Sequence, residues 1–214
     1  MRISNRIKEA GEAMVNSTTL TGPVWRQRQI NQIDTILVHR LDVKEVAEGL
    51  NAHILKVDIV ALARLSRSLD AIANRLAYPL LILKSGTIEQ GLSITAISPH
   101  GRKAWNGRAI GIAVEGDFRE EEPTAWQIEA LKWLLPRLFA AFCQPEVLYE
   151  DRKYPSLLGH GEAPGAHDGS KAPGRHGHCP GKYIDMQLFR TLCAQQAPPR
   201  IVAQDELAAS GLII

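Results

Sequence analysis

Two short, continuous apolar runs place the strongest constraint on the fold of this chain. They are Ile36–Val38, within a predicted strand at Ile33–His39, and Ala109–Val114. Runs of this kind are typical of strands that are buried on both faces of a sheet. The segments Leu62–Leu76 and Pro123–Phe142 instead repeat apolar residues at helical spacing. Strands that alternate with helices predict a single α/β domain, in which a mixed β-sheet is flanked by helices.

Weaker patterns predict the remaining elements. Leu80–Leu83 and Thr87–Gln90 predict a hairpin, and Leu157-Leu158 predicts a short strand. Val43–Leu50 has helical spacing, and Ile184–Cys193 predicts a final helix. We interpret the apolar stripe of Leu62–Leu76 as core packing rather than as a partner-binding surface.

The chain has 214 residues, which suits one domain with a substantial core and some peripheral segments. We expect an N-terminal arm at residues 1–30, the domain at 31–195 and a C-terminal tail at 196–214. A formal net charge of +2, with no basic stripe, gives no reason to predict nucleic-acid binding. The oligomeric state cannot be inferred from the sequence.

No stretch of the sequence approaches the roughly 20 consecutive apolar residues that a transmembrane helix needs. The first fifteen residues carry charges throughout and lack the apolar core of a secretory signal. We therefore expect synthesis in the cytoplasm without a signal peptide.

Candidate metal ligands gather in the stretch Leu157–Met186. Gly159-His160 opens a loop rich in glycine, proline and histidine, and Cys179-Pro180-Gly181 closes it. An imidazole and a thiolate are preferred ligands of Zn²⁺. A third ligand is needed, and His39, at the end of a predicted strand, is the candidate. Cys143 and Cys193 lie in apolar segments and are expected to be buried thiols.

The order His39, Gly159-His160, Cys179-Pro180-Gly181 resembles the type 2 N-acetylmuramoyl-L-alanine amidases, a family that includes phage lysozyme amidases and peptidoglycan recognition proteins. Tyr78-Pro79-Leu80-Leu81-Ile82 and the segment from Trp105-Asn106 to Ile110-Gly111-Ile112 resemble further motifs of that family. The resemblance covers about residues 33 to 192.

The resemblance implies a zinc enzyme that hydrolyses the amide bond between N-acetylmuramic acid and L-alanine in peptidoglycan, such as a phage or prophage lysis enzyme. His39, His160 and Cys179 would be the metal ligands. Such an enzyme would act on the cell wall, in the periplasm, after release from the cytoplasm. Its partner would be peptidoglycan or a muropeptide.

The resemblance also implies roles for other residues. Tyr78 matches a tyrosine that lies beside the metal, although a half-buried aromatic residue with a solvated hydroxyl group is the alternative interpretation. His176 is the second candidate catalytic residue. Arg40, Trp105 and Asn106 are the candidate substrate-binding residues.

Two positions depart from the family pattern. Ala113 replaces a glutamate found in some amidases, and Gly177 replaces a lysine that stabilises charge in phage amidases. Arg175 or His176 is expected to substitute for that lysine, and Lys171 is a weaker candidate. The departures keep two alternatives open: a module that binds muropeptide without cutting it, and a structural zinc domain closed by His176 or His178 as a fourth ligand.

Overall fold

The structure is a computed structural model that describes residues 26–41, 78–90, 92–101, 103–165 and 178–212. The predicted helices at Val43–Leu50 and Leu62–Leu76 lie outside these ranges, as do His176, Arg175 and Gly177.

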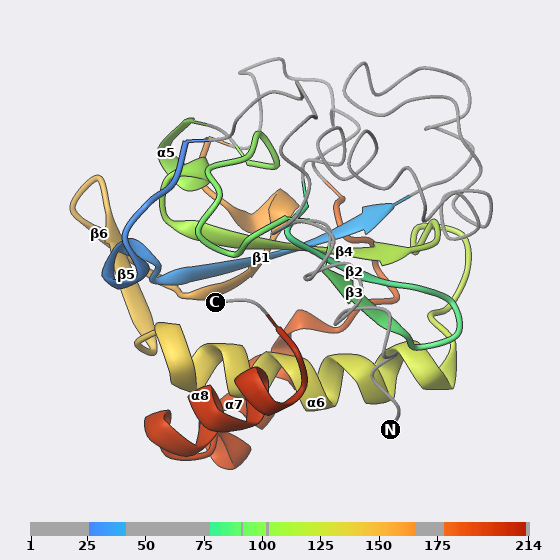
Figure 1. The fold of residues 1–214 in the computed structure, drawn as a ribbon. Coiled ribbons are helices and arrows are strands. Elements are labelled where there is room, and N and C mark those ends of the chain that lie inside the picture. Colours follow the sequence, from blue (N-terminus) through green and yellow to red (C-terminus); the bar gives the residue numbers. More distant parts are fainter. Residues whose placement is uncertain (1–25, 42–77, 91, 102, 166–177, 213–214) are drawn as a thin grey trace, which may run out of the picture.

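A five-stranded mixed sheet forms the centre of the molecule, in the order β3-β2-β4-β1-β7 (Figure 1). The central strand β1 pairs in parallel with β4 and β7, and β4 also pairs in parallel with β2. Only β3 runs antiparallel, as the second strand of a hairpin with β2. The sheet confirms the predicted fold class and strands, and its elements are β1 (Thr35–Leu41), β2 (Leu80–Ile82), β3 (Ile88–Gln90), β4 (Ala109–Glu115) and β7 (Leu157–Gly159).

Three helices lie on one side of this sheet: α6 (Ala125–Phe142), α7 (Met186–Gln196) and α8 (Arg200–Ala209). Thr124 caps α6, since its side chain accepts from the Gln127 amide while the Gln127 side chain accepts from the Thr124 amide. Pro136 lies inside α6 and is buried. The remaining elements are short: η1 (Ile30–Gln32), α5 (Lys103–Asn106), η3 (His160–Glu162), and a separate two-stranded hairpin of β5 (Glu146–Tyr149) and β6 (Arg152–Pro155).

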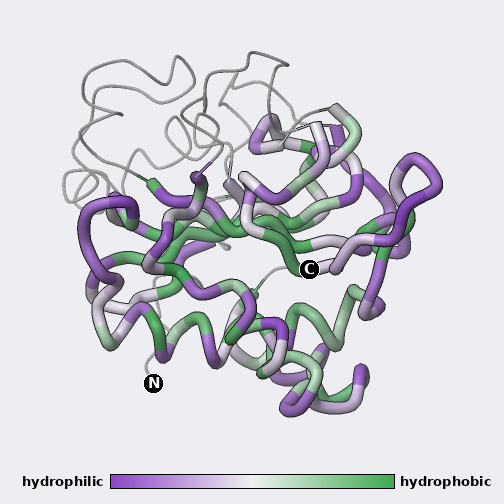
Figure 2. Tube along the Cα trace, turned by 180° about the vertical axis from the view of Figure 1, so that it is seen from behind, coloured by the Kyte–Doolittle hydropathy of each residue, from purple (hydrophilic) through white to green (hydrophobic). Residues whose placement is uncertain are grey.

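Side chains alternate between the two faces of the central strands. On β1, Ile36 and Val38 belong to the large core shared with the helices, whereas Leu37 belongs to a second apolar cluster with Trp105 of α5. His39 follows Leu37 by two residues and therefore lies on the face opposite the helices. The strands of the five-stranded sheet form the predominantly apolar centre of Figure 2, and the helices show alternating apolar and polar residues.

The segment interpreted from sequence as a C-terminal tail contains a further helix, α8. The helix predicted at Ile184–Cys193 corresponds to α7 and is therefore not the last one. Ala203 and Leu207 of α8 are fully buried and belong to the large core, and α8 packs mainly on α6. Ala203 and Leu207, four positions apart, are the buried residues of this helix. A pair of apolar residues at this spacing is too weak a pattern to predict a helix from the sequence. Among the described residues, no helix has the length and apolarity needed to cross a membrane.

Because α8 contributes to the core, truncating Leu207 should destabilise the whole domain. We expect Leu207→Ala to lower the free energy of unfolding by about 2–5 kcal/mol, through lost burial and the cavity left behind. Ile201→Ala, on the exposed side of the same helix, is the matched control and should change it by less than about 0.5 kcal/mol. Urea denaturation measures both values. Equal stability of the two variants would show that α8 is a detachable tail.

Candidate metal centre

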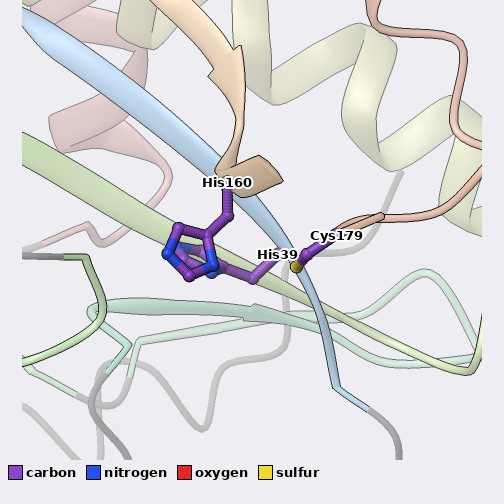
Figure 3. Close-up of side chains that lie close together, drawn as sticks. All are labelled: His39, His160 and Cys179. Carbon is purple, nitrogen blue, oxygen red and sulfur yellow. The ribbon is translucent and has the colours of Figure 1, made fainter. Parts of the chain in front are cut away.

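His39, His160 and Cys179 converge at one end of β1, from three distant parts of the chain (Figure 3). One ligand atom from each side chain lies within 4.8 Å of the other two, and all three residues are buried. Among the described residues, no other group of three or more histidine, cysteine or acidic side chains meets in this way. The three predicted ligands are thus brought together.

Strand pairing places the two histidines. Val38 of β1 is opposite Gly159 of β7 in the parallel register, so that His39 and His160 each follow one residue later. Their ring centroids are 4.5 Å apart. The sheet therefore sets the spacing of two ligands before any metal is bound.

The Cys179 loop is attached to the turn that carries His160. The Gly161 amide donates to the Cys179 carbonyl oxygen at 2.7 Å. Pro180 packs so closely on Gly159 that a Cβ atom at this glycine would lie 2.7 Å from Pro180 Cδ. Gly159 is therefore needed for the close approach of the two motifs.

Glu162 and Arg190 fix the same turn to helix α7. A Glu162 carboxylate oxygen accepts from the Gly159 amide at 2.7 Å and forms an ion pair with the Arg190 guanidinium group. Arg190 Nε also donates to the Leu157 carbonyl oxygen at 3.0 Å. Both ends of β7 are thereby tied to α7, which follows the Cys179 loop in sequence.

The donor set fits zinc. Ligand atoms around a tetrahedral zinc ion are about 3.3–3.8 Å apart, so small side-chain rotations would bring all three donors onto one ion. The Arg40 amide donates to Cys179 Sγ at 3.4 Å, a contact that favours the thiolate form. Burial instead raises the pKa of Cys193 to about 12 and raises the pKa of Cys143 further, so these two residues are neutral thiols, as predicted.

Two more aromatic side chains surround His39. The ring of Tyr78 is half-buried, and its centroid lies 4.9 Å from that of the His39 ring. Tyr78 is thus next to a candidate metal ligand, where the family resemblance places it. The His100 ring lies 5.4 Å from the His39 ring, edge to face, and is buried. Burial, followed by the charge of Arg28, lowers the pKa of His100 to about 3, so this side chain is neutral. Sequence reasoning assigned no role to His100.

Trp105 and Asn106 have contacts that hold the α5 loop to the sheet. Trp105 is buried, stacks on Tyr149 and donates from Nε1 to the Pro164 carbonyl oxygen at 2.8 Å. Asn106 Oδ1 accepts from the Gly101 amide at 2.7 Å. These contacts explain both residues as parts of the scaffold, and we propose no substrate contact for either.

Arg40 lies at the site, but its side chain is turned into the protein. Its Nε atom is 3.5 Å from Asp117 Oδ1, and the side chain is 4% exposed. Hydrogen bonds from Arg119 lower the pKa of Asp117, so this carboxylate is ionised beside Arg40. The backbone amide of Arg40 contacts one of the three donors, Cys179. His178 is exposed and does not join the three donors.

A family model described as N-acetylmuramoyl-L-alanine amidase matches residues 29–182. Among solved structures, the endolysin N-acetylmuramoyl-L-alanine amidase LysCS from Clostridium intestinale URNW is 20% identical, with a TM-score of 0.49, over 81% of this chain and 91% of that one. Wild-type PGRP-LB from Drosophila is 19% identical, with a TM-score of 0.48, over 86% of this chain and 92% of that one. A search of curated protein sequences gave no match.

The ligand assignment predicts that only one of the three cysteines controls metal content. Cys179→Ser should remove most of the bound zinc, because an alcohol is a poor ligand and two nitrogens remain. Cys143→Ser and Cys193→Ser are the controls, and each should retain the zinc content of the parent protein. Elemental analysis of the purified proteins measures this. Equal zinc loss in all three variants, or none in Cys179→Ser, would refute the assignment.

Proposed function

Since the chain belongs to the N-acetylmuramoyl-L-alanine amidase family, we propose that it is a zinc-dependent hydrolase. Its reaction is the cleavage of the amide bond between N-acetylmuramic acid and L-alanine in peptidoglycan. The observation that carries the proposal is the buried group of His39, His160 and Cys179 in a chain of this family. The cellular role as a phage or prophage lysis enzyme stays a prediction from the sequence.

Three protein donors suit a catalytic rather than a structural zinc site. Catalytic sites hold zinc through three protein ligands and keep one position open, whereas structural sites are closed by four. Within the described part of the chain, no fourth donor joins the group. A bound zinc ion would act as a Lewis acid on the amide carbonyl and lower the pKa of water. The role of the protein is to hold two neutral imidazoles and one thiolate around it.

Tyr78 is the described side chain best placed to act on the substrate. Its ring lies against His39 and is only half-buried, so its hydroxyl group has access to a ligand beside the donors. A phenol hydroxyl group can donate a hydrogen bond. We assign it the role of a hydrogen-bond donor to the oxygen atom on which negative charge develops. His176 lies outside the described residues, and its catalytic role stays a prediction.

One observation favours the alternative function, muropeptide binding without cleavage. Ala113 is directly opposite His39 in the register of β1 and β4. A glutamate there would lie beside the ligand group and could act as a base, whereas alanine has no proton-accepting group. A protein with alanine at this position could keep its metal ligands and bind muropeptide but lack turnover.

The two functions are separated by measuring metal content and turnover in one preparation. We expect the purified protein to contain about one zinc ion per chain and to release free stem peptide from purified cell wall. Chelation of the metal should abolish the release, and added zinc should restore it. Zinc and muropeptide binding without any release would replace the amidase assignment with the recognition function.

Loss of the Tyr78 hydroxyl group should slow the chemical step alone. Removing one preorganised donor typically lowers turnover by about 10²–10³. Tyr78→Phe keeps the ring against His39, so zinc content and muropeptide affinity should stay close to those of the parent. Tyr183→Phe removes an exposed hydroxyl group elsewhere and is the matched control. If both variants release stem peptide within a few-fold of the parent rate, Tyr78 is a packing residue.

A further inference from the structure

His100 forms a hydrogen-bonded link between the sheet and the candidate ligand His39. Its Nε2 atom is 3.2 Å from the Ala109 carbonyl oxygen, and its Nδ1 atom is 3.4 Å from His39 Nε2. Residue 100 is 5% exposed, so water does not compete freely for either contact. Both ring nitrogens of His100 therefore have partners inside the protein.

The two contacts determine where the protons lie. A carbonyl oxygen only accepts hydrogen bonds, so His100 Nε2 must carry a proton and donate it to Ala109. In a neutral imidazole the other nitrogen, Nδ1, then has a lone pair. His39 Nε2 must be the donor to that lone pair. The lone pair of His39 is consequently on its Nδ1 atom.

We propose that His100 is a positioning residue that holds the His39 proton on Nε2 and so makes Nδ1 the nitrogen that ligates the metal. This inference rests on the proposed zinc site. Metal-ligating histidines commonly donate their second ring N–H to a protein acceptor, which fixes the tautomer and the ring orientation. Here a second histidine, itself fixed by a backbone carbonyl group, is that acceptor.

Strand β4 has a gap in its side-chain surface that accommodates the His100 ring. Gly111 lies directly beneath it, and a Cβ atom built at this glycine would be 2.7 Å from both Cγ and Nδ1 of His100. Such a distance is too short for a real contact, so any larger residue would displace the ring. Gly111 is opposite Leu37 in the register, two residues before the pair His39 and Ala113. The gap is thus located where the ring can reach His39.

Zinc affinity of His100 variants tests the proposal, measured by competition with a chromogenic chelator. His100→Phe keeps an aromatic ring of slightly larger size but removes both nitrogens, and it should weaken zinc binding by about 10–100-fold. His100→Asn places an amide oxygen near the position of Nδ1, and it should restore most of the loss. A packing role alone would lower the stability of the metal-free His100→Phe protein as well as its zinc affinity, so thermal unfolding of the metal-free variants separates the two roles.

Gly111→Ala tests the same link without changing any titratable group. It should displace the His100 ring and weaken zinc binding in the same direction as His100→Phe. Gly107→Ala is the matched control, since a Cβ atom there would have no neighbour within 4 Å. Thermal unfolding of each metal-free protein shows that the variants compared are folded.

Nitrogen-15 NMR of the histidine side chains reads the tautomer directly. We expect His39 of the parent protein to carry its proton on Nε2, with and without zinc, and to lose this preference in His100→Phe. Zinc bound through His39 Nε2, or parent-like zinc affinity in both His100→Phe and Gly111→Ala, would overturn the inference while leaving the zinc enzyme intact. A parent protein that binds no zinc would overturn the metal site and this inference together.

Discussion

The parallel register of β1 with β4 and β7 is the constraint on which the candidate site depends. Side chains on a strand alternate with a period of two, so a slip of one residue would turn His39 towards the helices. The observed register instead places His39 beside His160 and opposite Ala113, on the face away from α6. Burial of Ile36 and Val38 against the helices stabilises this register. The same apolar packing that stabilises the sheet therefore orients a polar ligand.

The strands could be predicted from sequence because buried parallel strands have continuous apolar runs. The three donors were predicted from the order of their motifs, which resembles that of the amidase family, because no one of these motifs is specific by itself. The β5–β6 hairpin has no such signal. It is largely exposed, and its turn uses Glu150 and Asp151 at positive φ, where glycine or asparagine would have indicated a turn. Its pairing follows from the tertiary structure rather than from local sequence.

The site-facing surface of β4 explains why His100 was missed and why Trp105 is part of the scaffold. Large and small residues alternate along Ala109–Val114, with isoleucine and valine towards the helices and alanine or glycine towards the site. This alternation is visible in the sequence. An apolar run, however, is normally taken to indicate a buried strand, and the sizes of its individual side chains are not considered. The small residues make room for side chains from the preceding loop. That room holds the polar ring of His100 near His39, while Trp105 packs next to Leu37 as part of the scaffold.

The three cysteines show that environment, rather than residue type, decides which thiol can ligate a metal. Cys143 and Cys193 belong to the large apolar core, where burial raises the pKa of each thiol and keeps it protonated. Cys179 is equally buried but receives the Arg40 amide, a fixed dipole that favours the anion. That amide belongs to the residue directly after His39, so one segment of β1 provides one ligand and stabilises another. Strand β1 therefore both positions His39 in the metal site and stabilises the negative charge on Cys179.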